Sequence, residues 1–258
     1  MPELERPDGA RIHYEVRGEG PLVVLSLGFA ATPATYEGLV ADLARDHRVV
    51  TWEPRGCGTS SEDGPFEIAT DAADLLALIH ELGPPAIAYA VGHGVDVTIH
   101  AVATDGDAVS AFVTPGIVTA LREHLEGTEG FAASQNVTEL LVAQLRRDPR
   151  ASVRATIGSL NPQLDEDELR ARIDETLAYS SPETTLSRLE SWLARDSPID
   201  ELRALGDRLA VVWHEGDSWQ SGTIPRVREL LPDARVIQVD DGPLTRPDLQ
   251  AEVVRELS

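Results

Sequence analysis

The sequence predicts an α/β fold, a mostly parallel sheet flanked by helices, from three observations. Short apolar runs typical of buried strands recur along the chain, and segments with apolar residues at helical spacing separate them. Strand and helix signals alternate near both ends of the sequence, which is the pattern of a sheet covered on both faces. Between about 117 and 200 the strand signals stop and helix formers dominate, which predicts an all-helical insertion.

The first half of the chain contains five of the predicted strands. The strand over 10–17 alternates apolar and polar residues, as half-exposed strands do. The other four are apolar runs closed by glycine or proline, at 22–27, 48–53, 86–91 and 109–114. Helices with one apolar face are expected at 33–45, at 70–82, and from 97 onward.

The second half of the chain begins with the insertion. Its helices are expected near 134–147, 150–158, 165–180 and 182–195, where apolar residues recur at helical spacing. Strands then resume as apolar runs at 209–214 and 234–239, and helices are expected at 224–231 and 247–257. We therefore expect a core formed by 1–116 and 201–258, with 117–200 as a helical cap.

Composition excludes several classes of function. The net charge of −22 and pI of about 4.6 make nucleic acids and anionic membranes poor partners. All 22 basic residues are arginine, so lysine Schiff-base chemistry is excluded. A single cysteine, Cys57, excludes an internal disulfide, and no residue set has metal-ligand spacing, so neither metal nor cofactor is expected. The N-terminus lacks a signal-peptide core and no apolar run approaches the ~20 residues of a membrane span, which predicts a cytoplasmic protein.

The stretch 85–103 carries the most specific motif. An apolar run predicted as a buried strand leads into the turn Gly92-His93-Gly94-Val95-Asp96, and a helix-like segment follows. A strand, a sharp turn and a helix form the nucleophile elbow of Gly-x-Ser-x-Gly enzymes.

Four motifs together resemble the α/β-hydrolase-fold superfamily with a helical cap, which includes esterases, epoxide hydrolases and haloalkane dehalogenases. Gly28-Phe29 resembles the oxyanion loop, and 55–60 resembles the Arg-Gly-x-Gly-x-Ser loop. Val91-Gly92-His93 resembles the approach to the elbow, and Glu215-Gly216-Asp217 the loop with the catalytic acid. The resemblance covers nearly the whole chain and implies the fold of that superfamily.

The chain departs from that family at the catalytic triad. The resemblance places the nucleophile position at Gly94, which has no side chain, and the histidine position at Pro243. Asp96 replaces the last small residue of the elbow motif, and Leu27 replaces the histidine of the oxyanion loop. We therefore expect no serine-hydrolase activity.

Other groups of this site are candidates for different chemistry. The backbone N–H groups of Phe29 and Val95 are expected to converge as an oxyanion hole, which stabilises any developing oxyanion, including an enolate. Candidate catalytic residues are His93, which either acts as a base or packs behind the turn, and Asp217, a carboxylate base or a relic. Asp96 either points into the pocket or caps the following helix.

The pocket is expected to be lined by residues at the ends of the predicted strands and in the adjoining loops. We expect Cys57 to be a small buried hydrophobic residue rather than a nucleophile. The expected lining residues are Leu27, Tyr36, His214, Trp219 and Pro243.

Three functions remain open at this stage. The first is a cofactor-independent, non-hydrolytic enzyme, a cyclase, lyase or isomerase that moves protons on an apolar, carbonyl-bearing and polyketide-like metabolite. The second is a catalytically inactive protein that binds a small molecule or a protein partner. The third is a hydrolase with a non-standard nucleophile, through Cys57 or a water activated by Asp217. The expected partner is a small apolar metabolite, and the chain is expected to be a monomer or a homodimer.

Overall fold

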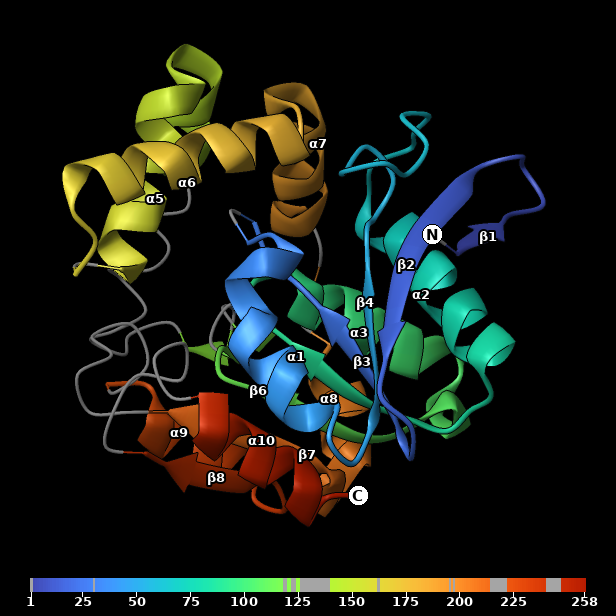
Figure 1. Ribbon diagram of the computed structural model, residues 1–258. Coiled ribbons are helices and arrows are strands. Elements are labelled where there is room, and N and C mark those ends of the chain that lie inside the picture. Colours follow the sequence, from blue (N-terminus) through green and yellow to red (C-terminus); the bar gives the residue numbers. More distant parts are fainter. Residues whose placement is uncertain are drawn as a thin grey trace.

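The computed structural model confirms the α/β fold and its mostly parallel sheet (Figure 1). Eight strands of the described residues form one sheet in the order β1-β2-β4-β3-β5-β6-β7-β8. β2 pairs antiparallel with β1 and β4, and the other neighbours pair parallel. The strands are β1 (Glu3–Glu5), β2 (Arg11–Arg17), β3 (Leu22–Ser26), β4 (Arg48–Trp52), β5 (Ala86–Ala90), β6 (Val109–Thr114), β7 (Leu209–Trp213) and β8 (Arg235–Gln238).

The structure describes residues 2–29, 31–117, 120–121, 124–125, 140–161, 163–194, 196, 198–213, 222–239 and 247–258. Helices follow most of the strands, and residues 140–147 are also helical. The labelled helices are α1 (Glu37–Leu43), α2 (Ile68–Leu82), α3 (His93–Thr104), α5 (Pro149–Leu160), α6 (Glu166–Tyr179), α7 (Pro182–Leu193), α8 (Ile199–Leu205), α9 (Ile224–Leu230) and α10 (Pro247–Glu256).

Alternation along β5 explains how the two helix layers pack. Ala86, Ala88 and Ala90 face the core formed with α2, α3 and α8, where small side chains let those helices approach the sheet. Ile87 and Tyr89 face the opposite core, formed with α1 and α10. Both faces of the strand are therefore buried, which is why its sequence is an uninterrupted apolar run.

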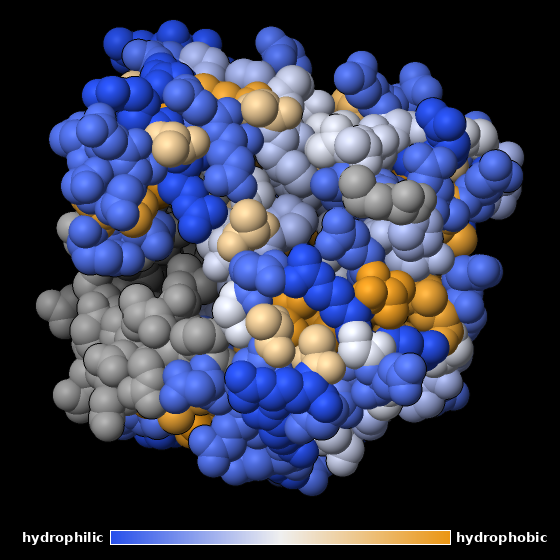
Figure 2. Space-filling model, in the orientation of Figure 1, coloured by the Kyte–Doolittle hydropathy of each residue, from blue (hydrophilic) through white to orange (hydrophobic). Residues whose placement is uncertain are grey.

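Helices α5, α6 and α7 lie together on one side of the molecule in Figure 1. Residues of α6 and α7 border the loops that follow β3, β4 and β5. Hydrophilic residues cover most of the face that Figure 2 shows, in keeping with the net charge of −22. Among the residues that the structure describes, no helix combines the length and apolar composition needed to cross a bilayer.

The structure differs from the sequence-based elements in several places. The expected helix at 33–45 divides into a 3₁₀ turn, Pro33–Tyr36, and α1. The helix after the central strand begins at His93 rather than at 97. β1 and α8 were not predicted, because each is short and carries little periodic signal.

Candidate functional site

Gly92 forms the apex of the turn between β5 and α3. Its backbone has φ 55° and ψ −133°, a conformation that residues with a Cβ adopt only at a cost, and α3 begins at the next residue. Gly92 is exposed, whereas its neighbours Val91 and Gly94 are buried. The expectation that Gly94 occupies the nucleophile position of the turn is therefore wrong by two residues. Gly92 occupies it, and both residues are glycine.

Gly94 instead lies inside α3, packed against the end of β3. A Cβ built on Gly94 would lie 2.2 Å from the carbonyl oxygen of Ser26 and 2.9 Å from that of Leu27. That oxygen of Ser26 also accepts a hydrogen bond from the N–H of Val91, at 3.1 Å. Gly94 thus serves close packing between α3 and the end of β3, and its position holds no functional side chain.

The apex faces the loop that follows β3. A Cβ on Gly92 would lie 3.1 Å from Cα of Gly28 and 3.9 Å from the backbone nitrogen of Phe29. A Cβ on Gly28 would in turn lie 2.8 Å from the carbonyl oxygen of Val91. The two glycines therefore let the two loops touch backbone to backbone and bring the N–H of Phe29 beside the apex.

Two backbone N–H groups at this point have no partner among the described residues, those of Phe29 and His93. His93 is the first residue of α3, so its N–H also lies at the positive end of the helix dipole. The N–H of Val95 donates to the carbonyl oxygen of Gly92 at 3.1 Å. The N–H of Val95 is therefore engaged within the turn, contrary to the expectation that it is an oxyanion donor, and the N–H beside that of Phe29 without a partner among the described residues is that of His93.

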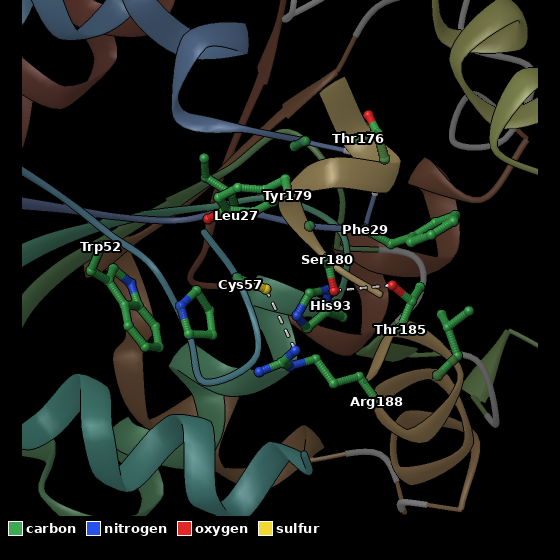
Figure 3. A pocket seen from close by; sticks show the side chains of 14 residues that line it. Leu27, Phe29, Trp52, Cys57, His93, Thr176, Tyr179, Ser180, Thr185 and Arg188 are labelled. Carbon is green, nitrogen blue, oxygen red and sulfur yellow. Dashed lines mark hydrogen bonds between the residues drawn. The ribbon is translucent and has the colours of Figure 1, made fainter. Parts of the chain in front are cut away.

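A pocket lies between these donors and helices α6 and α7. Figure 3 shows aromatic and aliphatic side chains around it, with the His93 ring and the Arg188 guanidinium close together. The wall is largely apolar, with a few polar groups, as in many small-molecule sites. Its residues are Leu27, Gly28, Phe29, Ala31, Trp52, Pro54, Cys57, His93, Thr176, Tyr179, Ser180, Thr185, Arg188 and Leu189.

The imidazole of His93 is half-buried in this wall and is held neutral. Burial, together with the positive charge of Arg188, lowers the pKa of His93 to about 3. At neutral pH the ring therefore carries one N–H donor and one acceptor nitrogen. A base with so low a pKa accepts a proton poorly, so this ring is better suited to hydrogen bonding than to proton transfer.

Arg188 enters the pocket from α7 and is 4% exposed. Its Nε and Nη2 donate to Asp71 of α2, at 2.7 and 3.1 Å, and its Nη1 donates to Sγ of Cys57 at 3.6 Å. Its guanidinium also lies over the ring of Phe66, with Cζ 5.5 Å from the ring centroid. Burial raises the pKa of Cys57, so this thiol is not activated as a nucleophile.

Two further expected site residues lie away from the pocket wall. Asp96 is 1% exposed, and its Oδ2 accepts a hydrogen bond from Nε1 of Trp192 on α7, at 2.9 Å. Tyr36 packs edge-on against Tyr89 in the core beneath α1, and burial raises its pKa. The expectation that Tyr36 lines the pocket is therefore wrong.

The other expected site residues, among them Asp217 and Pro243, lie outside the described residues. The given sequence contains no histidine after His214, so none stands at or near the expected histidine position, Pro243. In the part of the chain that the structure describes, no three His, Cys, Asp or Glu side chains are grouped to hold a metal ion. The four residues concerned are His214, Asp217, Trp219 and Pro243.

Sequence reasoning missed Arg188, the one cation among the described residues of the pocket wall. Its position carries a signal, since Thr184, Arg188 and Trp192 recur at intervals of four on the buried face of α7. An arginine in the apolar stripe of a helix predicts a buried partner or a ligand. The partner, Asp71, is 117 positions away and gives no local signal.

Two known proteins are similar in sequence to this chain. A putative carbamate hydrolase, RutD of Azorhizobium caulinodans, is 25% identical over 90% of this chain and 88% of its own. A probable oxidoreductase, EphD of Mycobacterium tuberculosis, is 36% identical over 95 residues, which are 35% of this chain, and the chain spans only 16% of that protein.

The crystal structure of an epoxide hydrolase from Bacillus megaterium superposes with a TM-score of 0.78 over 99% of both chains, at 16% identity, which establishes the likeness of fold alone. The model of the alpha/beta hydrolase family matches residues 22–255. This match spans β3 to α10 and includes both loops that meet at Gly92. The chain is a member of the α/β-hydrolase family.

Proposed function

We propose that this chain binds a small, largely apolar molecule through a carbonyl oxygen and does not hydrolyse it by a covalent route. The oxygen would accept hydrogen bonds from the N–H groups of Phe29 and His93. The apolar body would lie against Leu27, Trp52 and Tyr179 beneath α6 and α7. A polyketide-like metabolite, rich in carbonyl groups, is one class that fits.

The observation that carries this proposal is the exposed Gly92 apex beside an N–H group without a partner. A side chain at this apex would extend toward the nitrogen of Phe29, 3.9 Å from its Cβ. Glycine leaves that space free for a ligand oxygen while the fixed donors stay in place. No atom at the apex can form the covalent intermediate on which serine and aspartate hydrolases depend.

The neighbouring titratable groups favour binding over proton transfer. His93 is held neutral by its low pKa, Asp96 is engaged with Trp192, and Cys57 is buried with a raised pKa. None of these three is a base poised near neutral pH.

A titration of the ¹⁵N-labelled protein with benzylacetone, a neutral ketone, tests the proposal. The amide signals of Phe29 and His93 should shift most. Gly92→Ala should weaken binding at least about tenfold, because its Cβ occupies the space of the ligand oxygen and one lost hydrogen bond costs about 1–1.5 kcal/mol. Gly158→Ala on α5, where a Cβ meets only Leu169 Cδ2 at 4.0 Å, is the matched control. Equal affinity of Gly92→Ala and wild type would overturn the proposal.

A second candidate is a proton-transfer enzyme, because two fixed N–H donors also stabilise an enolate. Asp217 would then supply the base. Asp217→Asn should abolish turnover of an enolisable ketone, measured as loss of α-proton exchange in deuterium oxide, while leaving its affinity unchanged. Absence of exchange in the wild-type protein would leave binding as the function and remove the enzyme.

A further inference from the structure

Two buried arginines lie near the pocket, Arg55 and Arg188, and they differ in their hydrogen-bond partners. Arg55 donates from Nε and Nη2 to Oδ2 and Oδ1 of Asp74, at 2.7 and 3.0 Å. Its Nη1 donates to a second carboxylate, that of Asp8, at 2.5 Å. All three guanidinium nitrogens of Arg55 thus donate to a carboxylate oxygen.

Arg188 has the same two-bond contact with one aspartate, but among the described residues it has no second carboxylate partner. Its Nε and Nη2 donate to Oδ2 and Oδ1 of Asp71, at 2.7 and 3.1 Å, and Nη2 also donates to the carbonyl oxygen of Arg55. Among the residues that the structure describes, its Nη1 meets only the thiol of Cys57, at 3.6 Å, where Arg55 has a carboxylate. Sulfur is a weak acceptor, so a buried cationic donor is left poorly satisfied.

The incompletely paired nitrogen, Nη1 of Arg188, belongs to a residue of the pocket wall. Arg188 lines the same wall as Phe29 and His93, and Figure 3 shows its guanidinium directed toward Cys57 and the His93 ring. The same positive charge contributes to the low pKa of His93. Thus the pocket offers two separate places for ligand oxygen, one at the backbone donors and one at Nη1 of Arg188.

We propose that the ligand of this site is an oxo acid, whose carboxylate binds Nη1 of Arg188 while its ketone oxygen faces Phe29 and His93. This inference rests on the proposed function and adds the anionic group to it. The carboxylate takes the role at Arg188 that Asp8 has at Arg55. The apolar remainder of the acid packs against Trp52 and the other hydrophobic wall residues.

Three probes separate the two contacts. Phenylpyruvate carries both the carboxylate and the ketone, its methyl ester lacks the charge, and hydrocinnamate lacks the ketone. Calorimetric affinities at pH 7.5 should rank phenylpyruvate at least about tenfold above its ester, the effect of one charge-assisted hydrogen bond. Amide shifts at Phe29 and His93 should appear with phenylpyruvate and its ester and be smaller with hydrocinnamate.

The double variant Arg188→Gln/Asp71→Asn removes both charges together, so neither partner is left as a buried lone ion. It should bind phenylpyruvate and the ester alike, so the preference for the acid seen in the wild type is lost. The control Arg154→Gln/Glu166→Gln removes an exposed arginine–glutamate pair, 2.7 Å apart between α5 and α6, and should keep the preference for the acid. Circular dichroism verifies folding of both variants, and the acid–ester comparison in the wild type needs no variant.

The outcomes distinguish the inference from the function on which it rests. If the ester binds as tightly as the acid and shifts the Phe29 and His93 amides, the carboxylate site is refuted and carbonyl binding stands. If the double variant keeps the full preference for the acid, Arg188 is not its anchor and the inference is wrong. If neither probe binds at millimolar concentration, the proposed function fails as well.

Discussion

Adding one methyl group at Gly94 tests the structure of the turn more directly than any change in the pocket. In Gly94→Ala the new Cβ would lie 2.2 Å from the carbonyl oxygen of Ser26 and 2.6 Å from its carbonyl carbon, both backbone atoms of β3. An unstrained contact needs about 1 Å more, so either α3 or the end of β3 must move. Such a movement disturbs the 3.1 Å hydrogen bond from Val91 to Ser26.

The expected cost follows from these contacts. Overpacking of this kind costs about 1–3 kcal/mol, and a weakened buried backbone hydrogen bond adds about 1–3 kcal/mol. Replacing glycine by alanine within a helix returns about 1 kcal/mol. We therefore expect Gly94→Ala to lower the free energy of unfolding by about 1–5 kcal/mol, which compares with the ~5–15 kcal/mol of a typical domain.

Two further glycine variants serve as comparisons. The free energy of unfolding of all three is measured by urea unfolding, followed by circular dichroism. Gly158→Ala, also within a helix, meets no atom closer than 4.0 Å and should gain about 0.5–1 kcal/mol. Gly92→Ala should lose about 1–3 kcal/mol, because its φ of 55° strains alanine and its Cβ lies 3.1 Å from Gly28. A Gly94→Ala protein as stable as Gly158→Ala would refute the packing of α3 against β3.

Three further predictions concern the charged groups around the pocket. Because the pKa of His93 falls from 6.5 in the unfolded chain to about 3, the unfolded state binds the extra proton between these values, so stability should decrease as pH falls. Its ring signals in ¹³C-detected NMR should stay neutral from pH 8 to 5, while those of the urea-unfolded protein titrate, and His93→Gln should flatten the dependence of the melting temperature on pH in this range. Arg188→Met should lower the free energy of unfolding by about 3–5 kcal/mol, measured in urea, since it leaves Asp71 as an unpaired buried charge, whereas Arg188→Met/Asp71→Leu should recover most of it. Trp192→Phe should cost about 1–3 kcal/mol by leaving an acceptor oxygen of buried Asp96 without its 2.9 Å donor, and an unchanged urea midpoint would contradict that hydrogen bond.

The strands were predictable because a strand that is buried on both faces consists of consecutive apolar residues, as in 22–26 and 86–90. The register of the turn was not, because Gly92-His93-Gly94 offers two glycines and the motif fits either one. The backbone angles of Gly92 and the contacts of a Cβ on Gly94 decide between them, and the latter depend on Ser26 at the end of β3, 68 positions before Gly94.

The site itself was predictable only in part. The N–H of Phe29 and the lining by Leu27 follow from the loop after β3, which local sequence identifies. The cation could not be placed, since Arg188 and Asp71 belong to helices that meet only in the folded chain. Spacing along one helix indicates which face is buried, but not what that face meets.

The fold alone explains the glycines but not the arginine. Gly28 and Gly92 let two loops touch backbone to backbone in this fold, and Gly92 adopts its φ of 55° without strain. A buried ion pair is different, because well-packed apolar residues in its place are often as stable or more so. Arg188 and Asp71 are therefore not explained by stability, and Arg188 presents its least satisfied nitrogen to the pocket. That contrast makes the arginine, rather than the degenerate elbow, the feature of this site most indicative of a ligand.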